Sequence, residues 1–505
     1  RITLFFFFFL VGIVVDDSII IAENMHRHFH MKKLPFKQAA IYAINEVGNP
    51  TILATFTVIA AILPMAFVSG MMGPYMSPMP IGASIAMLLS LFVALTVTPY
   101  LGYHLLKVKD EKEHQEEQGL ETGFIYKWYK KIEQPFLDSS KKRWVMLGIT
   151  GVLLVISMLA FFTKWVAVKM LPFDNKNEVQ VVIDMPEGTT LEKTSVVAKE
   201  VSQYLRTVPE VVNYQNYVGS SSPITFNGLV RHYDMRGASN TADIQVNLLN
   251  KSERSKQSHD VAKTIRPEIQ KIARKFGANI KIVEVPPGPP VLSTIVAEVY
   301  GPDYDEQIRI ADEVQKILIN TEDVVDVDWM VEAPQGEFKI IPDKEKSMLN
   351  GIAPQQLVGN LNYLLGEYPV STLYDEKSSQ PVNMVMKLDN SEKSTIQDIT
   401  ALKVKGAAGN MMPVSDVVKI ERGTLEKSIY RKDQKRVVYV LADMAGALES
   451  PAYAILGMEE KLNKIKLPAG YKINELYMEQ PKDESDYTVK WDGEWQITLE
   501  VFRDL

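Results

Sequence analysis

The sequence predicts a membrane-spanning helical region followed by a larger α+β region. Apolar residues concentrate in the first third of the 505-residue chain, and beyond it apolar and polar residues alternate with strand and helix periods. A third observation is an adjacent pair of carboxylates, Asp16 and Asp17, inside the first apolar stretch. A carboxylate near a bilayer centre costs roughly 2.5–3.5 kcal/mol on insertion scales, so a chain that bears this cost twice is expected to use the pair.

Four apolar stretches have the length needed to span a bilayer. They are residues 2–22, 51–69, 81–101 and 144–163. Lysine and arginine occur in the connections after the first and third stretches, whereas the connection at 70–80 is uncharged. By the positive-inside rule, the first and third connections face the cytoplasm, and everything beyond about Pro172 lies on the far side.

Two segments of the cytoplasmic connections read as surface helices. Residues 36–47 carry small apolar residues along one face, and Gly-Asn-Pro at 48–50 is expected to end this helix before the second span. Residues 125–137 interleave Trp128, Tyr129 and Phe136 with lysines, which is typical of an interfacial helix on an anionic leaflet. A plain linker helix is the alternative for the second segment.

Beyond the spans, a strand–helix–strand pattern recurs. The first unit has strands at 178–184, 211–217, 242–249 and 279–285, with helices at 190–206 and 259–276. This order is the split βαβ, or ferredoxin-like, pattern. The second unit has strands at 294–300, 324–331, 436–444 and 471–476, with helices at 305–320 and 451–464. An insertion at 335–422, with short strands of its own, interrupts it.

Two segments flank the repeated units. The proline-rich linker at 286–290 separates the first unit from the second. Residues 488–504 are amphipathic and rich in tryptophan, so we expect a helix returning to a membrane interface.

Composition excludes several classes of function. The chain has no cysteine, which excludes disulfides and thiolate metal sites. The net charge of -7, without a basic stripe, argues against a nucleic-acid partner. The chain starts at Arg1 inside or just before a span, so we interpret it as a piece of a longer protein. Acidic residues within the first apolar stretch argue against a cleavable signal peptide.

The acid pair fits a proton carrier. Adjacent helical positions point about 100° apart, and two carboxylates this close are not both ionised in a dry site. A Lys or Arg partner is absent from the other three predicted spans. The alternatives are a helix cap at the interface, an intramembrane aspartyl protease, or a scaffold without proton flux. The protease needs a second Asp on another span, and the other three spans contain none.

Six motifs together resemble the resistance-nodulation-division (RND) efflux pumps, from their fourth transmembrane helix onward. They are GIVVDDSIIIAEN at 12–24, EVGNP at 46–50, LPMAF at 63–67, ALTVTP at 94–99, MLP at 170–172 and MPEGTT at 185–190. The resemblance covers nearly the whole chain.

The resemblance implies α-helical transmembrane segments plus an α+β periplasmic domain, with two ferredoxin-like porter subdomains and an inserted docking subdomain. It implies these bounds: transmembrane helices 4–6 at 1–106, a cytoplasmic loop with an interfacial helix at 107–143, transmembrane helix 7 at 144–171, the first porter subdomain at 172–289, the second at 290–334 and 423–480, the docking subdomain at 335–422, and an amphipathic segment at 481–505 leading to the next helix.

The family also implies a function. Its members are homotrimeric proton/substrate antiporters of the Gram-negative inner membrane, driven by the proton gradient without a cofactor, and they are not enzymes. They work with a periplasmic adaptor, or membrane fusion protein, and an outer-membrane channel. Asp16 and Asp17 match the proton-relay pair, and the relay lysine of the family lies on later helices.

The paired acids favour the hydrophobe/amphiphile, acriflavine-resistance-like branch, because the heavy-metal branch carries one Asp there and a methionine relay. Met185 lies where a metal-branch methionine is expected, but a single Met more often packs, so no metal site is predicted. The alternatives are a heavy-metal cation exporter and a proton-driven lipid or secretion factor.

Substrate contacts are expected in the cleft between the porter subdomains. The Ser- and Gly-rich loop at 219–229, with Phe226, is placed to divide that cleft. Strand residues Ile295, Ala297 and Val299 alternate on one face and are candidates to line it. A solvated loop and a core strand face are the alternatives.

Overall fold

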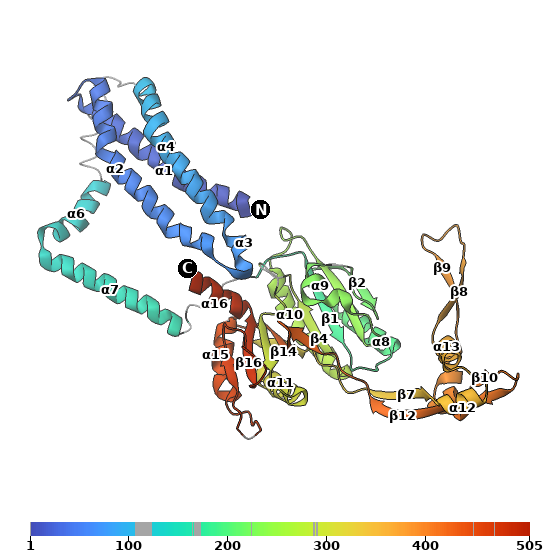
Figure 1. Cartoon of the computed structure of the whole chain (residues 1–505). Helices are drawn as coiled ribbons and strands as arrows, with labels where there is room; N and C mark the ends of the chain where they lie inside the picture. The colour runs from blue at the N-terminus through green and yellow to red at the C-terminus, as the bar shows by residue number, and fades with distance from the viewer. Residues whose placement is uncertain are drawn as a thin grey trace. The chain divides into compact units, whose positions relative to one another are not determined.

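A computed structural model describes residues 2–106, 124–163, 165, 173–223, 225–285, 288, 291–447, 449–468 and 470–505 (Figure 1). For some residues inside helices only the backbone is described. The chain divides into two compact units. The first comprises Arg1–Val331 and Ile429–Leu505, and the second comprises Glu332–Ser428.

Three helices of the first unit pack into a bundle: α1 (Ile2–Met31), α2 (Phe36–Ile62) and α4 (Pro78–Leu105). Small residues of α2 form much of the contact, because Ala39, Ala40 and Ala43 are buried together with Ile21 and Met25 of α1. Such residues let helix backbones approach closely. Short elements connect α2 to α4: η1 (Leu63–Phe67), η2 (Gly70–Met72) and α3 (Gly73–Met76).

The helix predicted to end at residues 48–50 does not end there. Helix α2 continues through Pro50 to Ile62, so the cytoplasmic helix and the second span are one element. A proline inside a helix removes one backbone hydrogen bond, which neighbouring helices and hydroxyl side chains compensate in membranes. Here the hydroxyls of Thr51 and Thr55 donate to carbonyls one turn back, at 2.8 and 2.9 Å.

Three described segments are long and apolar enough to cross a membrane: Phe36–Phe67, Gly70–Leu105 and Ser140–Ala160. The remaining predicted span, residues 2–22, lies in α1, where most side chains before Val15 are outside the described residues. Helix α7 (Ser140–Phe162) exposes apolar side chains all round, as a lipid-facing helix does. Helix α6 (Phe124–Asp138) includes the residues predicted to form an interfacial helix. Its contact with an anionic leaflet stays a prediction.

An α+β region, which we call the first lobe (residues 173–285), follows. Its strands are β1 (Glu178–Asp184), β2 (Val211–Val218), β3 (Thr241–Leu248) and β4 (Asn279–Val283), and its helices are α8 (Leu191–Leu205), α9 (Phe226–Arg231), η3 (Tyr233–Met235) and α10 (Ser258–Phe276). The strands form an antiparallel sheet in the order β2-β3-β1-β4. Strands and long helices lie within two residues of the predicted bounds, because apolar residues recur with a period near two in the strands and near 3.6 in the helices.

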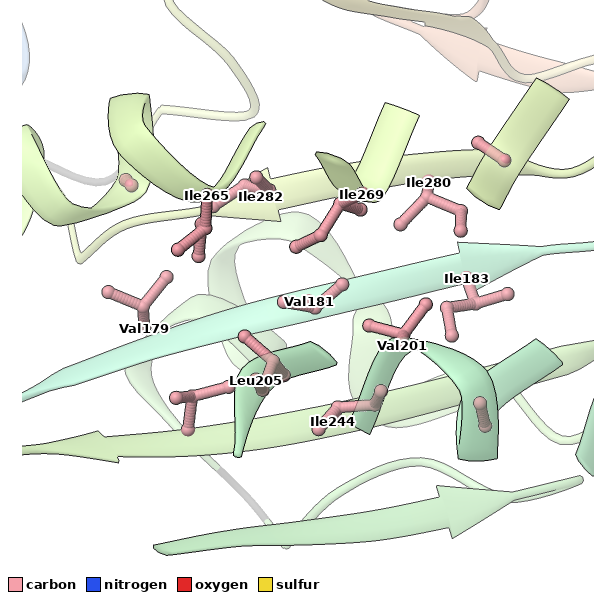
Figure 2. Close-up of a cluster of buried hydrophobic side chains, with 14 of the residues drawn as sticks. Val179, Val181, Ile183, Val201, Leu205, Ile244, Ile265, Ile269, Ile280 and Ile282 are labelled. Atoms are coloured by element: carbon pink, nitrogen blue, oxygen red, sulfur yellow. The ribbon is translucent and has the colours of Figure 1, made fainter. Parts of the chain in front are cut away.

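The core of the first lobe lies between this sheet and helices α8 and α10. Figure 2 shows Val181 of β1 among Val201 and Leu205 of α8 and Ile265 and Ile269 of α10. Burying one such side chain contributes about 1.5–3 kcal/mol. The opposite face of the sheet is also largely covered, and it carries polar residues of the candidate site described below.

The second lobe comprises residues 291–331 and 429–505. Its elements are β5 (Ile295–Tyr300), α11 (Tyr304–Ile319), β6 (Val324–Trp329), β13 (Tyr430–Lys432), β14 (Lys435–Met444), α15 (Pro451–Leu462), β15 (Asn474–Leu476), β16 (Thr488–Gly493) and α16 (Glu494–Asp504). The sheet runs in the order β13-β14-β5-β16-β15, and β6 pairs with β14. Its core packs against α11 and α15.

The prediction of one helix over 488–504 is wrong for its first six residues. They form β16, which lies between β5 and β15 in the sheet. Val489 and Trp491 alternate into the core, so two-residue periodicity and tertiary pairing outweigh the amphipathic helical pattern. Gly493, at φ 83°, turns the chain, and only then does α16 begin.

The second unit has its own core, formed by Ile352, Leu357, Val404, Val414 and neighbouring apolar residues. Its elements are β7 (Gly336–Pro342), α12 (Lys344–Leu349), α13 (Pro354–Leu365), β8 (Tyr368–Leu373), β9 (Val382–Met386), η4 (Asn390–Lys393), α14 (Ile396–Ala401), β10 (Lys403–Lys405), β11 (Met411–Pro413), η5 (Val414–Asp416) and β12 (Val418–Thr424). Strands β7 and β12 pair along their full length. The insertion predicted at 335–422 lies inside this unit.

Candidate functional site

The acid pair lies on α1 with its two members in different surroundings. Asp17 is half-buried and faces α2, where the Thr55 hydroxyl donates to Asp17 Oδ2 at 3.2 Å. Thr55 itself is buried. Asp16 is exposed, about 100° round the helix from Asp17. Among the described residues, no Lys or Arg forms an ion pair with either acid.

A polar cluster that was not predicted from the sequence joins the C-terminal part of α1 to α2. Asn24 Nδ2 donates to the Ala43 carbonyl at 2.9 Å and to Glu46 Oε2 at 3.2 Å. His28 Nε2 lies 2.7 Å from the same Glu46 oxygen. Asp17, Asn24 and His28 are spaced by seven and four residues, so they share one stripe of α1 facing α2. This spacing is the signal that would have identified them.

A cavity of about 450 Å³ lies between the two lobes. The first lobe contributes α9, η3 and β4, and the second contributes β6, β13, β14 and the segment before β5. Its aromatic and apolar lining comprises Tyr233, Met235, Leu292, Met330, Tyr430, Tyr439 and Leu441. Its charged and polar lining comprises Arg231, His232, Arg236, Lys281, Ser293, Asp326, Asp328, Arg431 and Asp443. The cavity therefore offers both an apolar wall and fixed charges.

Asp443 of β14 is the most heavily bonded acid of this lining. Arg231 of α9 donates to both of its carboxylate oxygens, at 2.8 and 3.3 Å. The Ser293 hydroxyl and the Thr294 backbone N–H and hydroxyl also donate to it, at 2.8 to 3.0 Å. Burial by itself raises the pKa of Asp443, but Arg231 and these donors outweigh burial and hold the pKa well below its usual range. The carboxylate is thus charged and saturated.

A second group of charges lies where β4 meets β6. Lys281 of β4 pairs with Asp328 of β6 and, at 2.8 Å, with Asp184 of β1. Burial alone lowers the pKa of Lys281, yet the two carboxylates raise it above its ordinary value, so it stays charged. Arg236 also pairs with Asp184 and, at 2.5 Å, with Asp243, and it donates to the Ile183 carbonyl at 2.9 Å.

Helix α10 supplies further contacts to the second lobe. Arg266 pairs with Asp326, and Asp326 Oδ2 accepts a hydrogen bond from the Ile282 N–H at 3.0 Å. His259 lies between Glu284 and Glu449, at 2.8 Å from each. Burial lowers the pKa of His259, but the hydrogen bonds to the two carboxylates outweigh this and raise the pKa to about 9.

The described ion pairs that join the lobes all have the same polarity. Every cation belongs to the first lobe, and every carboxylate belongs to the second. The pairs are Arg231–Asp443, His259–Glu449, Lys263–Glu449, Arg266–Asp326 and Lys281–Asp328. The two lobes thus present opposite charges to each other.

The substrate residues predicted on β5 are not in a cleft. Ile295, Ala297 and Val299 have no exposed surface and pack in the core of the second lobe. Alternation correctly indicated that they share one face, but it cannot reveal whether helices or a ligand cover that face. The prediction that they line a substrate cleft is therefore wrong for this structure.

The segment 219–229, predicted as a loop, is partly helical, and its role in dividing a substrate cleft stays a prediction. Its last residues begin helix α9, whose N-cap hydroxyl, Thr225 Oγ1, accepts from Gly228 N at 3.1 Å. The Phe226 side chain lies outside the described residues. The residues that line the cavity follow directly, from Arg231 to Arg236. Sequence reasoning missed them because their partners are far away along the chain.

Comparison with known proteins agrees with this architecture. A sequence model of the AcrB/AcrD/AcrF family matches residues 1–489. The swarming motility protein SwrC of Bacillus subtilis (strain 168) is 23% identical over 480 residues, covering 92% of this chain and 42% of that protein. The multidrug resistance protein MdtC of Pectobacterium carotovorum subsp. carotovorum (strain PC1) is 21% identical over 426 residues, covering 82% of this chain and 38% of MdtC.

The chain thus spans less than half the length of these relatives. Among solved structures, a crystal structure of a heavy metal efflux pump matches with a TM-score of 0.71 and 18% identity, covering 98% of this chain and 46% of that one. At this identity the likeness shows a shared fold and leaves the transported substrate open.

Proposed function

Since the chain belongs to the AcrB/AcrD/AcrF family of RND transporters, which are not enzymes, we propose that it is part of a proton-driven exporter of hydrophobic or amphiphilic compounds. The observation that carries this proposal is the pair Asp16 and Asp17 within a helix of the membrane bundle. In the complete transporter, protons would move through this pair. The counter-charge would come from the remaining length of the protein.

We propose that the two lobes are the porter subdomains and that both have the ferredoxin-like arrangement. The strand order β2-β3-β1-β4, with two helices covering one face, supports this for the first lobe. The second lobe is interrupted between β6 and β13 by residues 332–428, which would be the docking subdomain, and the separate core of this insertion supports that assignment. Movement of one lobe against the other would open and close the cavity, as in alternating access.

A direct contact offers a path for coupling protonation to the lobes. Asp504 of α16 accepts hydrogen bonds from the Ser69 backbone N–H at 2.8 Å and from its hydroxyl at 2.5 Å. Ser69 lies in the connection between α2 and α4. A shift of α2 after protonation of Asp17 would therefore act on α16 and the second lobe.

The mixed lining of the cavity supports an amphiphilic substrate, because Tyr430, Tyr439 and Met330 offer apolar surface beside fixed charges. The second candidate is export of a metal cation, because the chain shares the fold of a heavy metal efflux pump, and a shared fold does not by itself set the substrate. Among the described residues, no group of three or more His, Asp or Glu side chains is arranged to hold a metal ion.

We further propose that the transporter is a homotrimer of the Gram-negative inner membrane. Its lobes would lie in the periplasm, where a periplasmic adaptor and an outer-membrane channel would complete the export path. Export assays with dyes and with copper or zinc salts, in cells making the complete transporter, distinguish the two substrate classes.

The proton relay is tested by Asp16→Asn and Asp17→Asn, each in the complete transporter. Each change removes an ionisable group without changing its size, so we expect loss of export with the oligomer intact. The measurement is dye efflux, with size-exclusion chromatography of the purified protein as the check on assembly.

Glu23→Gln is the matched control, because Glu23 is an exposed acid on the same helix. It should export normally. Normal efflux in either aspartate variant would remove the proton relay from the proposal.

A further inference from the structure

We infer that the interlobe cavity selects amphiphiles with an anionic head group, carboxylates above all. This inference rests on the proposed function and specifies the substrate class of the same site. The carboxylates of the lining are hydrogen-bonded by protein groups, whereas two of its arginines have N–H donors without a partner among the described residues.

The carboxylates of the lining are engaged. Asp443 accepts from Arg231, Ser293 and Thr294. Asp326 and Asp328 each accept from a basic side chain of the first lobe and from one further nitrogen. A cationic head group entering the cavity would have to compete with these internal donors, and displacing one would leave a buried protein cation without its partner.

Lys281 and Arg236 of the lining are each paired with two carboxylates, whereas Arg231 and Arg431 retain donors without a partner among the described residues. Arg231 Nε is buried and has no hydrogen-bond partner among the described residues, although the other two nitrogens of the same guanidinium hold Asp443. A buried donor without a partner costs free energy, and a ligand acceptor would relieve that cost. Asp443 fixes the Arg231 side chain, so this donor is preorganised.

Arg431 of β13 is the second cation with spare donors. Its guanidinium donates to the Gln434 carbonyl of its own turn at 3.1 Å, and within the described residues it forms no ion pair. It is exposed and lines the same cavity as Arg231. Guanidinium groups bind planar carboxylates through paired N–H donors, so two of them at one cavity favour that head group.

The apolar part of the cavity specifies the rest of the molecule. Tyr430 and Tyr439 meet edge to face with their ring centroids 6.4 Å apart, beside Leu441 and Met330. An alkyl or aromatic tail would contact this wall while the head group meets Arg431 and Arg231. A small anion such as acetate would use only the polar half and would therefore bind weakly.

The test uses the complete transporter in phosphatidylcholine nanodiscs, with empty discs to correct for partition into lipid. Binding is measured for probes of equal tail and different head: decanoate, decyltrimethylammonium and decyl maltoside, with acetate as the tail-free anion. We expect decanoate to bind at least about tenfold more tightly than the other probes, because it alone gains charge-assisted hydrogen bonds and tail contacts.

Two variants locate the site. Arg431→Gln should weaken decanoate binding about tenfold and leave decyltrimethylammonium unchanged. Arg231→Lys keeps the charge facing Asp443 but lacks the Nε donor, so it should weaken decanoate only. Arg422→Gln is the control, since Arg422 lies in the second unit over the Phe338 ring and is not part of the lining. Thermal unfolding midpoints establish that each variant is folded.

Equal binding of the three decyl probes, or loss of all three in Arg431→Gln, would overturn the inference and leave the proposed function standing. Binding of acetate as tight as that of decanoate would also overturn it. Absence of proton-dependent export for every decyl probe and dye would instead reject the proposed function, whichever probe binds.

Discussion

His259 is the residue at which a single proton affects contact between the lobes. Its imidazole bridges Glu284 of the first lobe and Glu449 of the second, and it stacks on the Phe173 ring at 3.7 Å between centroids. Lys263 contacts the same Glu449, at 2.7 Å. Loss of the imidazolium charge would leave Glu284 beside a neutral ring and Glu449 with Lys263 as its cation.

The pH dependence of this site has a definite sign. The pKa of His259 is about 9 in the folded protein and about 6.5 in an unfolded chain. The stabilisation is fully present below pH 6.5 and is lost as the pH rises through 9. Its upper limit is about 3 kcal/mol. We expect the thermal unfolding temperature of the lobes to decrease as the pH is raised from 7 to 10.

The control variant His259→Gln should be less stable at pH 7 and should lose most of this pH dependence. Tryptophan fluorescence reports the unfolding, since Trp491 and Trp495 lie in the core of the second lobe. Parallel pH profiles for the two proteins would contradict the assignment of the effect to His259.

At the scale of elements, the junction of β16 and α16 depends on one glycine. Gly493 has φ 83°, and a Cβ there would lie 2.5 Å from the Ser293 carbonyl oxygen and 2.9 Å from that of Thr294. Both are backbone atoms and cannot move aside easily. Gly493→Ala should therefore lower the free energy of unfolding by about 1–3 kcal/mol, measured by chemical denaturation.

Gly457→Ala is its matched control. Gly457 lies within α15, and a Cβ there would meet no atom within 4 Å. Alanine favours a helix over glycine by about 1 kcal/mol, so this change should stabilise the protein. Stabilisation by both changes would mean that Gly493 is not conformationally required.

The contact of β4 with β6 depends on Arg266. Replacing it with methionine leaves the Asp326 carboxylate buried without its partner, at a cost of roughly 3–5 kcal/mol. We expect faster amide hydrogen exchange at Ile282, whose N–H donates to Asp326, and unchanged exchange in β1. Arg274→Met, an exposed change on the same helix, should alter neither.

Helices and strands were predicted correctly where the pattern of neighbouring residues alone determines the structure. Residues 178–184 are a strand as predicted, because apolar residues recur at every second position, 179, 181 and 183. Residues 488–493 read as helix because Trp491 and Trp495 also fit a helical stripe, and only pairing with β5, nearly two hundred residues earlier, decides between the two. The continuation of α2 through Pro50 likewise depends on packing against α1.

Site residues could be predicted from sequence only where their free-energy cost is visible in the neighbouring residues. Asp16 and Asp17 could be predicted as a candidate site because a charge in an apolar stretch is costly wherever the chain folds. The pairs of the cavity, such as Arg231 with Asp443, join residues more than two hundred positions apart, and an ordinary arginine in a sequence gives no sign of its partner. Their recognition requires the fold.

At the scale of the whole molecule, the second unit is expected to be dispensable for the folding of the first. Residues 332–428 have a separate core. Strands β6 and β14 pair with each other on either side of the insertion. Replacing residues 334–426 with a short Gly-Ser linker should leave amide exchange in β5, β14 and β16 unchanged. Rapid exchange throughout the second lobe would contradict this independence.

The one-way charge arrangement between the lobes also constrains how the protein can change during evolution. A reversal of charge on either lobe alone would place like charges against each other, so viable changes are expected in coordinated pairs. Exchange of one whole lobe with that of a relative would succeed only if the relative keeps basic residues on the first lobe and acidic residues on the second at these contacts. The charges at this interface are therefore expected to be inherited together, because a lobe functions only with a partner lobe of matching charge.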